Sequence, residues 1–416
     1  MREMKDSGIE WVGTIPTHWS TMPNKYVMRK IKVINPTYNG ENILSLTVNG
    51  VIVRDLEAGG KMPSSFDGYQ ILYKGNLLMC LFDYDVTPRC IGLIKDFGIS
   101  SPAYSQFVLQ RGNDAAYFYY YYLMVDHTKA LLHRAKNLRH SFTEEQLGAI
   151  KVPVPPIAEQ ERIADFLNFQ CSQIDAISAD IQKEIEILEQ YKRSLVFEAI
   201  SKGINGDETA NTSSDIWKEI PQSWKLVDIK YLFEIVKRIA GREGYNILSV
   251  TQKGLKVKDI SGNQGQIAEN YSGYQFVFPS DYVMNHMDLL TGWVDCSDQF
   301  GVTSPDYRVF RLRDKTQSDT AYYKYVMQCC YMCRIFYSLG QGVSTLGRWR
   351  LQTSAFMNFK VPVPPLHEQK EIAHYLNDKC KEIELSIEQK RKQLELLSAY
   401  KKSLIYEYVT GKKEVI

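Results

Sequence analysis

The chain has 416 residues, of which 44% are hydrophobic and 24% are charged, a composition typical of a folded globular protein. Its net charge of +2 excludes a strongly basic protein, so any surface for nucleic acid must be local. No apolar run approaches the ~18 residues of a membrane-spanning helix, and the first residues lack the apolar core of a signal peptide. The eight scattered cysteines favour free thiols, so we expect a cytoplasmic protein with no membrane contact.

Two long stretches of the chain carry the same motifs in the same order. Ile-Pro-x-x-Trp begins at Ile15 and again at Ile220, and Asn-Ile-Leu-Ser begins at Asn42 and again at Asn246. After Asn42 and after Asn246, alternating apolar and polar residues precede a glycine, which predicts a strand that enters a turn. The spacing between matching motifs stays nearly constant, so the two stretches are expected to share one fold.

Each stretch then becomes helical, over residues 117–135 and 322–339. Six consecutive aromatic residues begin at Tyr117, and they could form a platform for stacking bases or a packed helix face. Because six consecutive side chains point all round a helix, we interpret most of them as core. Cys330 and Cys333 form one Cys-x-x-Cys pair, with Cys329 beside them, and no second cysteine or histidine pair is nearby. We therefore interpret all three as buried on a helix and not as zinc ligands.

The segment KVPVPPIAEQERIADFL, Lys151 to Leu167, recurs as KVPVPPLHEQKEIAHYL from Lys360 to Leu376, 209 residues later. The double prolines interrupt the preceding structure, and the glutamate that follows suits a first helical turn. No further proline or glycine occurs before Gly203 in the first copy or Gly411 in the second. Two helices of about 45 residues, each ~65 Å long, are therefore predicted.

Both long helices carry a heptad seam of apolar residues, which favours coiled-coil pairing between them. The seam residues are Ile174, Ile181, Ile185, Leu188 and Leu195 in the first copy, and Ile383, Ile387, Leu394, Leu397, Leu404 and Tyr408 in the second. Ser178 and Lys192 interrupt the first seam, and Lys390 and Lys401 interrupt the second. The alternative is two separate amphipathic helices, each lying on its own domain.

The direction of the pair follows from the polar segment between the two halves. The twelve polar residues 204–215 span at most ~43 Å, less than the ~65 Å that a parallel pair would require. We therefore predict an α+β protein in which two pseudo-twofold-related α/β domains are separated by a pair of long antiparallel coiled-coil helices. The expected boundaries are 1–150 and 217–359 for the domains, 151–203 and 360–416 for the helices, and 204–216 for a linker.

The sequence contains none of the catalytic motifs that we searched for. The chain lacks a phosphate-binding loop, a His-Glu-x-x-His pair and a Gly-x-Ser-x-Gly elbow. Asp83 and Asp85 could hold a cation, but the second half keeps an equivalent of Asp83 alone, at Asp288, which favours a solvated turn.

Two domains on a fixed spacer suit a two-part linear target such as a DNA duplex. Basic loops follow the aromatic helix in both halves and could contact phosphates, while the turns after the first strands could reach bases. The loop candidates are Lys136, Arg139 and His140, and Ser344, Arg348, Trp349 and Arg350. The turn candidates are Thr47 and Asn49, and Thr251, Gln252 and Lys253, with Tyr84 and Arg89 as weaker candidates. For a few basic loop residues, plain solvation is the alternative.

The combination of a duplicated domain with Val-Pro-x-Pro-Pro-x-x-Glu-Gln and a long helix resembles the specificity (S) subunit of type I restriction–modification systems. The segments Pro155–Gln160 and Pro364–Gln369 carry most of the resemblance, which covers nearly the whole chain. Asn76 departs from the aspartate usual in that family, whereas Asp281 in the second half fits it. The resemblance implies two target-recognition domains joined by a central and a distal conserved helix.

The resemblance further implies a non-catalytic subunit that binds an asymmetric bipartite duplex DNA sequence, one half per domain, across a fixed gap. It implies two methyltransferase (M) subunits, which transfer methyl from S-adenosylmethionine to adenine N6, and restriction (R) subunits that use ATP and Mg²⁺. No cofactor or metal is expected on this chain itself. The alternatives are a scaffold or inhibitor that keeps the fold but binds protein partners, and a stand-alone enzyme.

Overall fold

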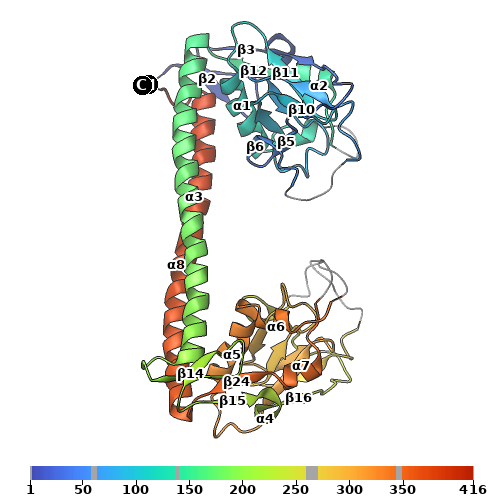
Figure 1. Cartoon of the computed structure of the whole chain (residues 1–416). Coiled ribbons are helices and arrows are strands. Elements are labelled where there is room, and N and C mark those ends of the chain that lie inside the picture. The colour runs from blue at the N-terminus through green and yellow to red at the C-terminus, as the bar shows by residue number, and fades with distance from the viewer. Residues whose placement is uncertain (1, 58–62, 136–139, 259–269, 343–348, 416) are drawn as a thin grey trace. The chain divides into compact units, whose positions relative to one another are not determined.

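The protein forms two compact units, which are described separately. The computed structural model describes residues 2–57, 63–135, 140–258, 270–342 and 349–415. One unit comprises Met1–Gln182 with Lys392–Ile416, and the other comprises Lys183–Arg391. Each unit contains one globular part, which we call its head, and a part of each of two long helices (Figure 1).

The first head mixes small antiparallel sheets with short helices. Its central sheet has the strand order β4-β11-β8-β9, and the other strands pair as β1-β2, β3-β12, β5-β6 and β7-β10. The strands are β1 Met4–Asp6, β2 Thr14–Pro16, β3 Ser20–Pro23, β4 Met28–Ile31, β5 Leu44–Thr47, β6 Gly50–Val53, β7 Gln70–Leu72, β8 Leu77–Met79, β9 Ile91–Leu93, β10 Gly98–Ser100, β11 Ser105–Leu109 and β12 Lys151–Val154. The helices are η1 Asn24–Tyr26, α1 Ala115–His127, η2 Leu132–Arg134 and α2 Glu144–Ala149.

The second head repeats this topology strand for strand. Its central sheet has the order β16-β23-β20-β21, with the pairs β13-β14, β15-β24, β17-β18 and β19-β22. The strands are β13 Thr209–Asn211, β14 Glu219–Pro221, β15 Lys225–Asp228, β16 Phe233–Val236, β17 Leu248–Thr251, β18 Gly254–Val257, β19 Gln275–Val277, β20 Tyr282–Met284, β21 Val294–Cys296, β22 Gly301–Thr303, β23 Arg308–Leu312 and β24 Lys360–Val363. The helices are α4 Ile229–Leu232, α5 Thr320–Met332, α6 Ile335–Ser338 and α7 Thr353–Met357.

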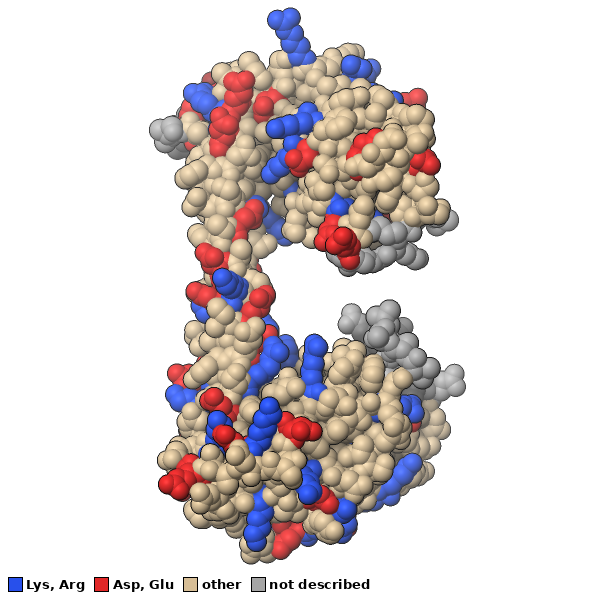
Figure 2. Space-filling view, in the orientation of Figure 1, with Lys and Arg blue, Asp and Glu red and all other residues tan. Residues whose placement is uncertain are grey.

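Helices α3 (Ile157–Lys202) and α8 (Leu366–Val409) are the two long helices, at 46 and 44 residues. In the first unit the start of α3 pairs with the end of α8, where the Phe166 and Tyr408 ring centroids lie 4.4 Å apart. In the second unit the end of α3 pairs with the start of α8. The helices therefore run antiparallel, which confirms the predicted fold class. Charges of both signs are interspersed along their surface (Figure 2).

The lysines that interrupt the heptad seam bridge to the partner helix. Lys192 Nζ lies 2.5 Å from Glu384 Oε1, and Lys401 Nζ lies 2.5 Å from Asp175 Oδ1. The two bridges are equivalent, because Lys192 and Asp175 each match the residue 209 positions later in the other bridge. The aliphatic part of each lysine covers the seam, while its ammonium group reaches a carboxylate beside the seam. The same bridge between the helices therefore occurs twice.

The repeated Glu-Gln pair connects each long helix to its head. In the first unit Trp19 Nε1 donates to Glu159 Oε2 at 2.6 Å, and the buried Gln160 accepts from Asp114 N at 2.8 Å. In the second unit Trp224 Nε1 donates to Glu368 at 2.7 Å, and Gln369 accepts from Asp319 N at 2.8 Å. Each glutamine also donates to the proline five residues earlier, at Pro155 O and Pro364 O. The Ile-Pro-x-x-Trp and Pro-Pro-x-x-Glu-Gln motifs thus recur together because they contact each other.

The aromatic helices α1 and α5 lie against β9 and β21 in their respective heads. Tyr117, Tyr121 and Tyr322 are fully buried, which confirms the interpretation of the aromatic run as core. Both helices are shorter than predicted, because Lys129 and Arg334 adopt left-handed backbone angles (φ 49° and 55°) that stop helix propagation. Cys329 and Cys330 are buried on α5, as expected, whereas Cys333 is only partly buried and follows the last residue of that helix.

Residues 204–216, expected to be a flexible linker, contain a short strand. They include β13, which pairs with β14 as β1 pairs with β2 in the first head. The segment is therefore the first strand of the second head as well as a connection, and the other domain boundaries stay predictions. Among the described residues, no helix combines the length and apolar character needed to cross a membrane.

Candidate functional site

The turn between β5 and β6, residues 47–50, is the exposed tip that the sequence predicted in the first head. Thr47 Oγ1 accepts from Asn49 N at 3.1 Å and donates to Gly50 O at 3.1 Å. Gly50 has a φ of +99°, which L side chains rarely adopt. This closed turn leaves the Val48 and Asn49 side chains exposed to solvent.

The turn between β17 and β18, residues 251–254, has the same construction in the second head. Thr251 Oγ1 accepts from Lys253 N at 3.1 Å and donates to Gly254 O at 2.8 Å, and Gly254 has a φ of +93°. Gln252 and Lys253 are exposed. The two heads therefore present the same backbone turn with different chemistry, Val-Asn in one and Gln-Lys in the other.

Arg89, a weaker candidate for target contact, supports the first turn from inside the head. Its Nη1 donates to Val48 O at 2.6 Å, its Nε donates to Ile91 O at 3.1 Å, and its Nη2 donates to the Tyr119 hydroxyl. Three guanidinium nitrogens are thus engaged with protein groups. The sequence identified the residue but not this role.

Asp295 on β21 supports the second turn and was missed by the sequence reasoning. Its Oδ2 accepts from Leu255 N at 2.9 Å, directly after the turn. Its Oδ1 lies 3.3 Å from Nε2 of Gln328 on α5. The signal available in the sequence was the mismatch between Asp295 and its equivalent Gly92.

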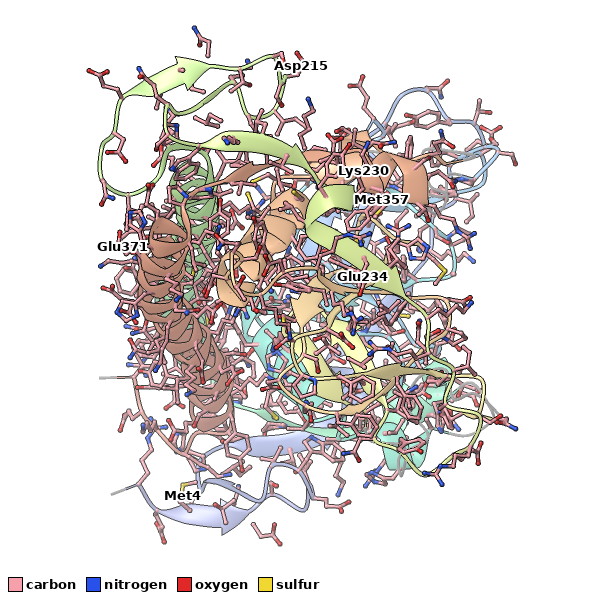
Figure 3. The ribbon with its side chains drawn as sticks, turned by 90° about the horizontal axis from the view of Figure 1, so that it is seen from below. Met4, Asp215, Lys230, Glu234, Met357 and Glu371 are labelled. Carbon is pink, nitrogen blue, oxygen red and sulfur yellow. The ribbon has the colours of Figure 1, made fainter. Side chains whose placement is uncertain are left out.

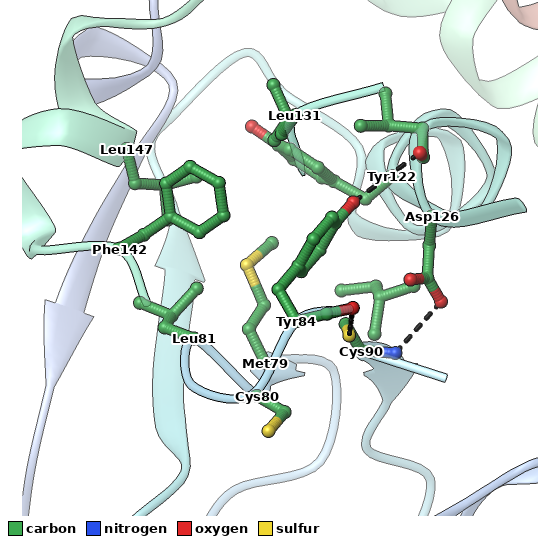
Figure 4. Close-up of a pocket in the computed structure, with 12 residues that line it drawn as sticks. Met79, Cys80, Leu81, Tyr84, Cys90, Tyr122, Asp126, Leu131, Phe142 and Leu147 are labelled. Atoms are coloured by element: carbon green, nitrogen blue, oxygen red, sulfur yellow. Dashed lines mark hydrogen bonds between the residues drawn. The ribbon is translucent and has the colours of Figure 1, made fainter. Parts of the chain in front are cut away.

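The structure corrects the prediction for Tyr84. Its side chain is only 5% exposed and lines a cavity of about 30 Å³ in the first head (Figure 4). Its hydroxyl points to Val125 O at 3.5 Å, and burial, followed by the charge of Asp126, raises its pKa well above the usual value. Asp126 accepts from Cys90 N at 2.8 Å in the same place. A phenol packed in this way has no surface with which to contact a base.

The basic loops are described only in part. Lys136, Arg139, Ser344 and Arg348 lie outside the described residues. His140 Nδ1 lies 3.1 Å from Asp85 Oδ2, and the Trp349 ring packs against Tyr337 with centroids 5.0 Å apart. Arg350 is exposed, while its backbone pairs with Gln341. Target contact by these loops stays a prediction.

The second head has another hollowed surface, at the β16 edge of its central sheet. A depression of about 650 Å³ is lined by Glu234, Arg238, Arg311 and neighbouring residues. Arg311 Nε lies 2.5 Å from Glu234 Oε1, and Arg238 pairs with Asp281. Figure 3 labels Glu234 on β16, Lys230 on α4 and Met357 on α7, and α4 packs against both β16 and α7. These charges pair within the head, so the depression is a weaker binding candidate than the turns.

The described part of the chain contains no group of three or more His, Cys, Asp or Glu residues placed to hold a metal ion. For Asp83 and Asp85 the sequence favoured a turn over a cation pair. Asp83 does lie in a turn with a left-handed backbone (φ 48°), and its carbonyl accepts from Thr87 N at 2.9 Å.

Comparison with known proteins gives consistent matches. A family model described as the type I restriction modification DNA specificity domain matches residues 81–187 and 221–396. The specificity subunit of the type I restriction enzyme MjaVIII from Methanocaldococcus jannaschii is 27% identical over 285 residues, 64% of this chain and 63% of that protein. The putative MjaX specificity subunit of the same organism is 27% identical over 305 residues, 69% of this chain and 64% of that protein.

A solved structure described as showing complex assembly and conformational transition of the type I R-M system contains a chain with the same fold. The TM-score is 0.67 at 14% identity, over 96% of this chain and 99% of that chain. The curated relatives are matched over slightly less than two thirds of their own length. The structural match, by contrast, includes both heads and both long helices.

Proposed function

The chain belongs to the family of type I restriction–modification DNA specificity domains, and on this basis we propose that it is the DNA-recognition subunit of such a system. It binds an asymmetric bipartite duplex, one half-site per head. It carries no catalytic centre, and it positions M subunits for adenine-N6 methylation and R subunits for cleavage. S-adenosylmethionine, ATP and Mg²⁺ are then bound by those partners.

One observation carries the proposal: the two heads present the same turn with different exposed side chains. The same turn can approach the DNA backbone in the same way at each half-site, because B-DNA repeats its backbone geometry along the axis. Different side chains at the tips suit two different base sequences, since bases are distinguished by donor and acceptor patterns in the major groove. Val48 and Asn49 against Gln252 and Lys253 therefore predict unequal half-sites.

The test is selection of duplexes from a random library by the chain purified with its methyltransferase partner. We expect a bipartite motif with two unequal half-sites and a fixed gap. The Asn49→Ala variant should relax the first half-site only, and Gln252→Ala the second only. The matched controls are Glu161→Ala and Glu371→Ala, exposed positions on the long helices that should leave both half-sites unchanged.

Two outcomes would overturn the proposal. Failure to enrich any motif, together with tight binding of a protein partner, would support the scaffold or inhibitor alternative. Methyl transfer by the isolated chain, or binding of labelled S-adenosylmethionine to it, would show that the catalytic and cofactor assignments are wrong.

A further inference from the structure

We propose that Arg89 in the first head and Asp295 in the second are positioning residues that fix the two turns, so that each determines the half-site selected by its own head. The inference rests on the proposed function and assigns a role to residues that lie behind the exposed tips. It follows from the contacts of the two side chains and from the way in which the heads differ at these positions.

Arg89 joins the first turn to two other elements of its head. Its planar guanidinium reaches the turn at Val48 O, strand β9 at Ile91 O and helix α1 at the Tyr119 hydroxyl. The guanidinium carbon also lies 5.7 Å from the Tyr119 ring centroid. Because the donors of a guanidinium keep a fixed mutual geometry, three such contacts set the position of the turn relative to β9 and α1.

Asp295 makes the corresponding connection in the second head with opposite chemistry. Its carboxylate accepts from the backbone of Leu255, the residue after the turn, and from Gln328 on helix α5. A Cβ at Gly254 would lie 2.6 Å from Asp295 Oδ2, so the turn backbone rests directly on the carboxylate. Here too the turn is tied to the neighbouring strand and to the aromatic helix.

Neither support can be exchanged between the heads. Gly92 occupies the place of Asp295 in the first head, where a Cβ would lie 2.6 Å from Val51 Cγ2. Gly292 lies two residues before β21, as Arg89 lies two residues before β9, and a Cβ there would lie 2.0 Å from Asp288 O. Each head therefore excludes even a methyl group where the other head places its positioning residue.

Separate supports predict effects confined to one half-site. A turn that loses its support shifts relative to the duplex, so its base contacts weaken while the phosphate contacts of the chain remain. Arg89→Ala should reduce discrimination in the first half-site by about tenfold and leave the second unchanged. Asp295→Ala should do the reverse.

Conservative variants test the geometry without removing the side chain. Asp295→Asn keeps one acceptor oxygen for Leu255 N but turns its NH2 group toward the N–H donors of Cys296 and Gln328, so it should retain discrimination only in part. Arg89→Lys keeps the charge but loses the planar fork, so it should behave more like Arg89→Ala. Discrimination is measured in the complex with the methyltransferase partner, as the ratio of affinities for preferred and single-mismatch duplexes, at several salt concentrations.

The salt series separates positioning from direct phosphate contact. If Arg89 contacted a phosphate, Arg89→Ala would weaken all duplexes equally and reduce the salt dependence, and that result would overturn the inference. Equal loss in both half-sites, or no change in either, would also overturn it.

Amide hydrogen exchange gives a readout that needs no DNA. Arg89→Ala should speed exchange at residues 48–50 but not at residues 252–255, and Asp295→Ala should do the opposite. If the wild-type chain selects no bipartite motif, the proposed function fails. Unchanged exchange at the turns in both variants would refute the positioning role itself.

Discussion

At the scale of single residues, the two heads use different pairs of side chains to supply hydrogen bonds at one equivalent buried position. In the first head Gln106 Oε1 accepts from Tyr73 N at 2.8 Å and from Asn76 Nδ2 at 3.0 Å. In the second head Asp281 accepts from Phe278 N at 2.8 Å and pairs with Arg238. Asn76 occupies the position of Asp281, and in the first head Gln106 supplies the acceptor. Val33 stands where the second head has Arg238, so the first head lacks that arginine.

This difference between the heads predicts the effect of placing an aspartate at position 76. Asn76→Asp should destabilise the first head by about 1–3 kcal/mol, because it buries a carboxylate against the Gln106 oxygen without an equivalent of Arg238. Adding Val33→Arg should recover part of the loss by supplying the missing partner. Urea unfolding of the single and double variants measures both effects, and a double variant less stable than Asn76→Asp would contradict the account.

His286 makes the second head sensitive to acid. Burial, followed by the charges of Arg308 and Arg350, lowers the pKa of His286 from 6.5 to about 4. The unfolded chain binds the proton more readily than the folded one, so the stabilisation is complete above pH 6.5 and is lost as the pH falls toward 4.

The His286→Gln variant should therefore lose less stability than the wild type between pH 6.5 and pH 4, since its side chain takes up no proton. Thermal unfolding across this range measures the difference. Parallel curves for the two proteins would show that the imidazole does not titrate as described.

At the scale of elements, alanine substitutions at Gly50 and Gly254, which close the two turns, allow the cost of backbone strain to be compared with that of a steric clash. Gly50→Ala meets no atom closer than Arg89 Nη2 at 4.0 Å, so it should cost only the strain of its positive φ, about 1–3 kcal/mol. Gly254→Ala has a similar φ and also places its Cβ 2.6 Å from Asp295 Oδ2. The second substitution should thus be more destabilising in chemical unfolding, and equal effects would argue against the close contact.

The seam lysines of α3 and α8 offer a test of helix pairing. Replacing Lys192 or Lys401 by Leu should raise stability by about 1 kcal/mol each, because apolar burial in the seam outweighs the loss of one exposed ion pair. The controls Glu384→Ser and Asp175→Ser remove the same bridges and should change stability by less than ~1 kcal/mol. A fall in the melting temperature of both Leu variants would show that the lysines are essential to the pair.

At the scale of the whole molecule, we expect the long helices to determine the gap between half-sites. Inserting one heptad at facing positions of both helices keeps the seam in phase and adds ~10 Å of helix. The selected motif should keep its half-sites and lengthen its gap, by up to about three base pairs at ~3.4 Å each. Library selection measures this, and an unchanged gap would refute the expectation.

Several large features were predictable because repetition in the sequence reports them directly. The duplication, the antiparallel helices and the buried tyrosines follow from motif spacing, heptads and the density of aromatic residues. The ends of α1 and α5 were not predictable, since they depend on left-handed residues at Lys129 and Arg334. Arg89 and Asp295 were hidden as supports because each acts across some 40 residues of chain, through contacts that only the folded head creates. Tyr84 was misjudged because an aromatic residue in a loop gives no indication of its burial.

The end of α8 has a consequence for how the protein is made on the ribosome. Gly411 packs so closely on Pro16 that a Cβ there would lie 2.5 Å from its Cδ, and the Tyr117 hydroxyl donates to Val409 O at 2.9 Å. The first unit therefore includes residues 392–416, whereas the second is a continuous stretch of the chain. Residues 1–182 must wait for residues 392–416 to be translated, so the second unit can complete its folding before the first. Released chains that end at residue 391 should therefore have a second unit that resists protease and a first unit that remains open to cleavage.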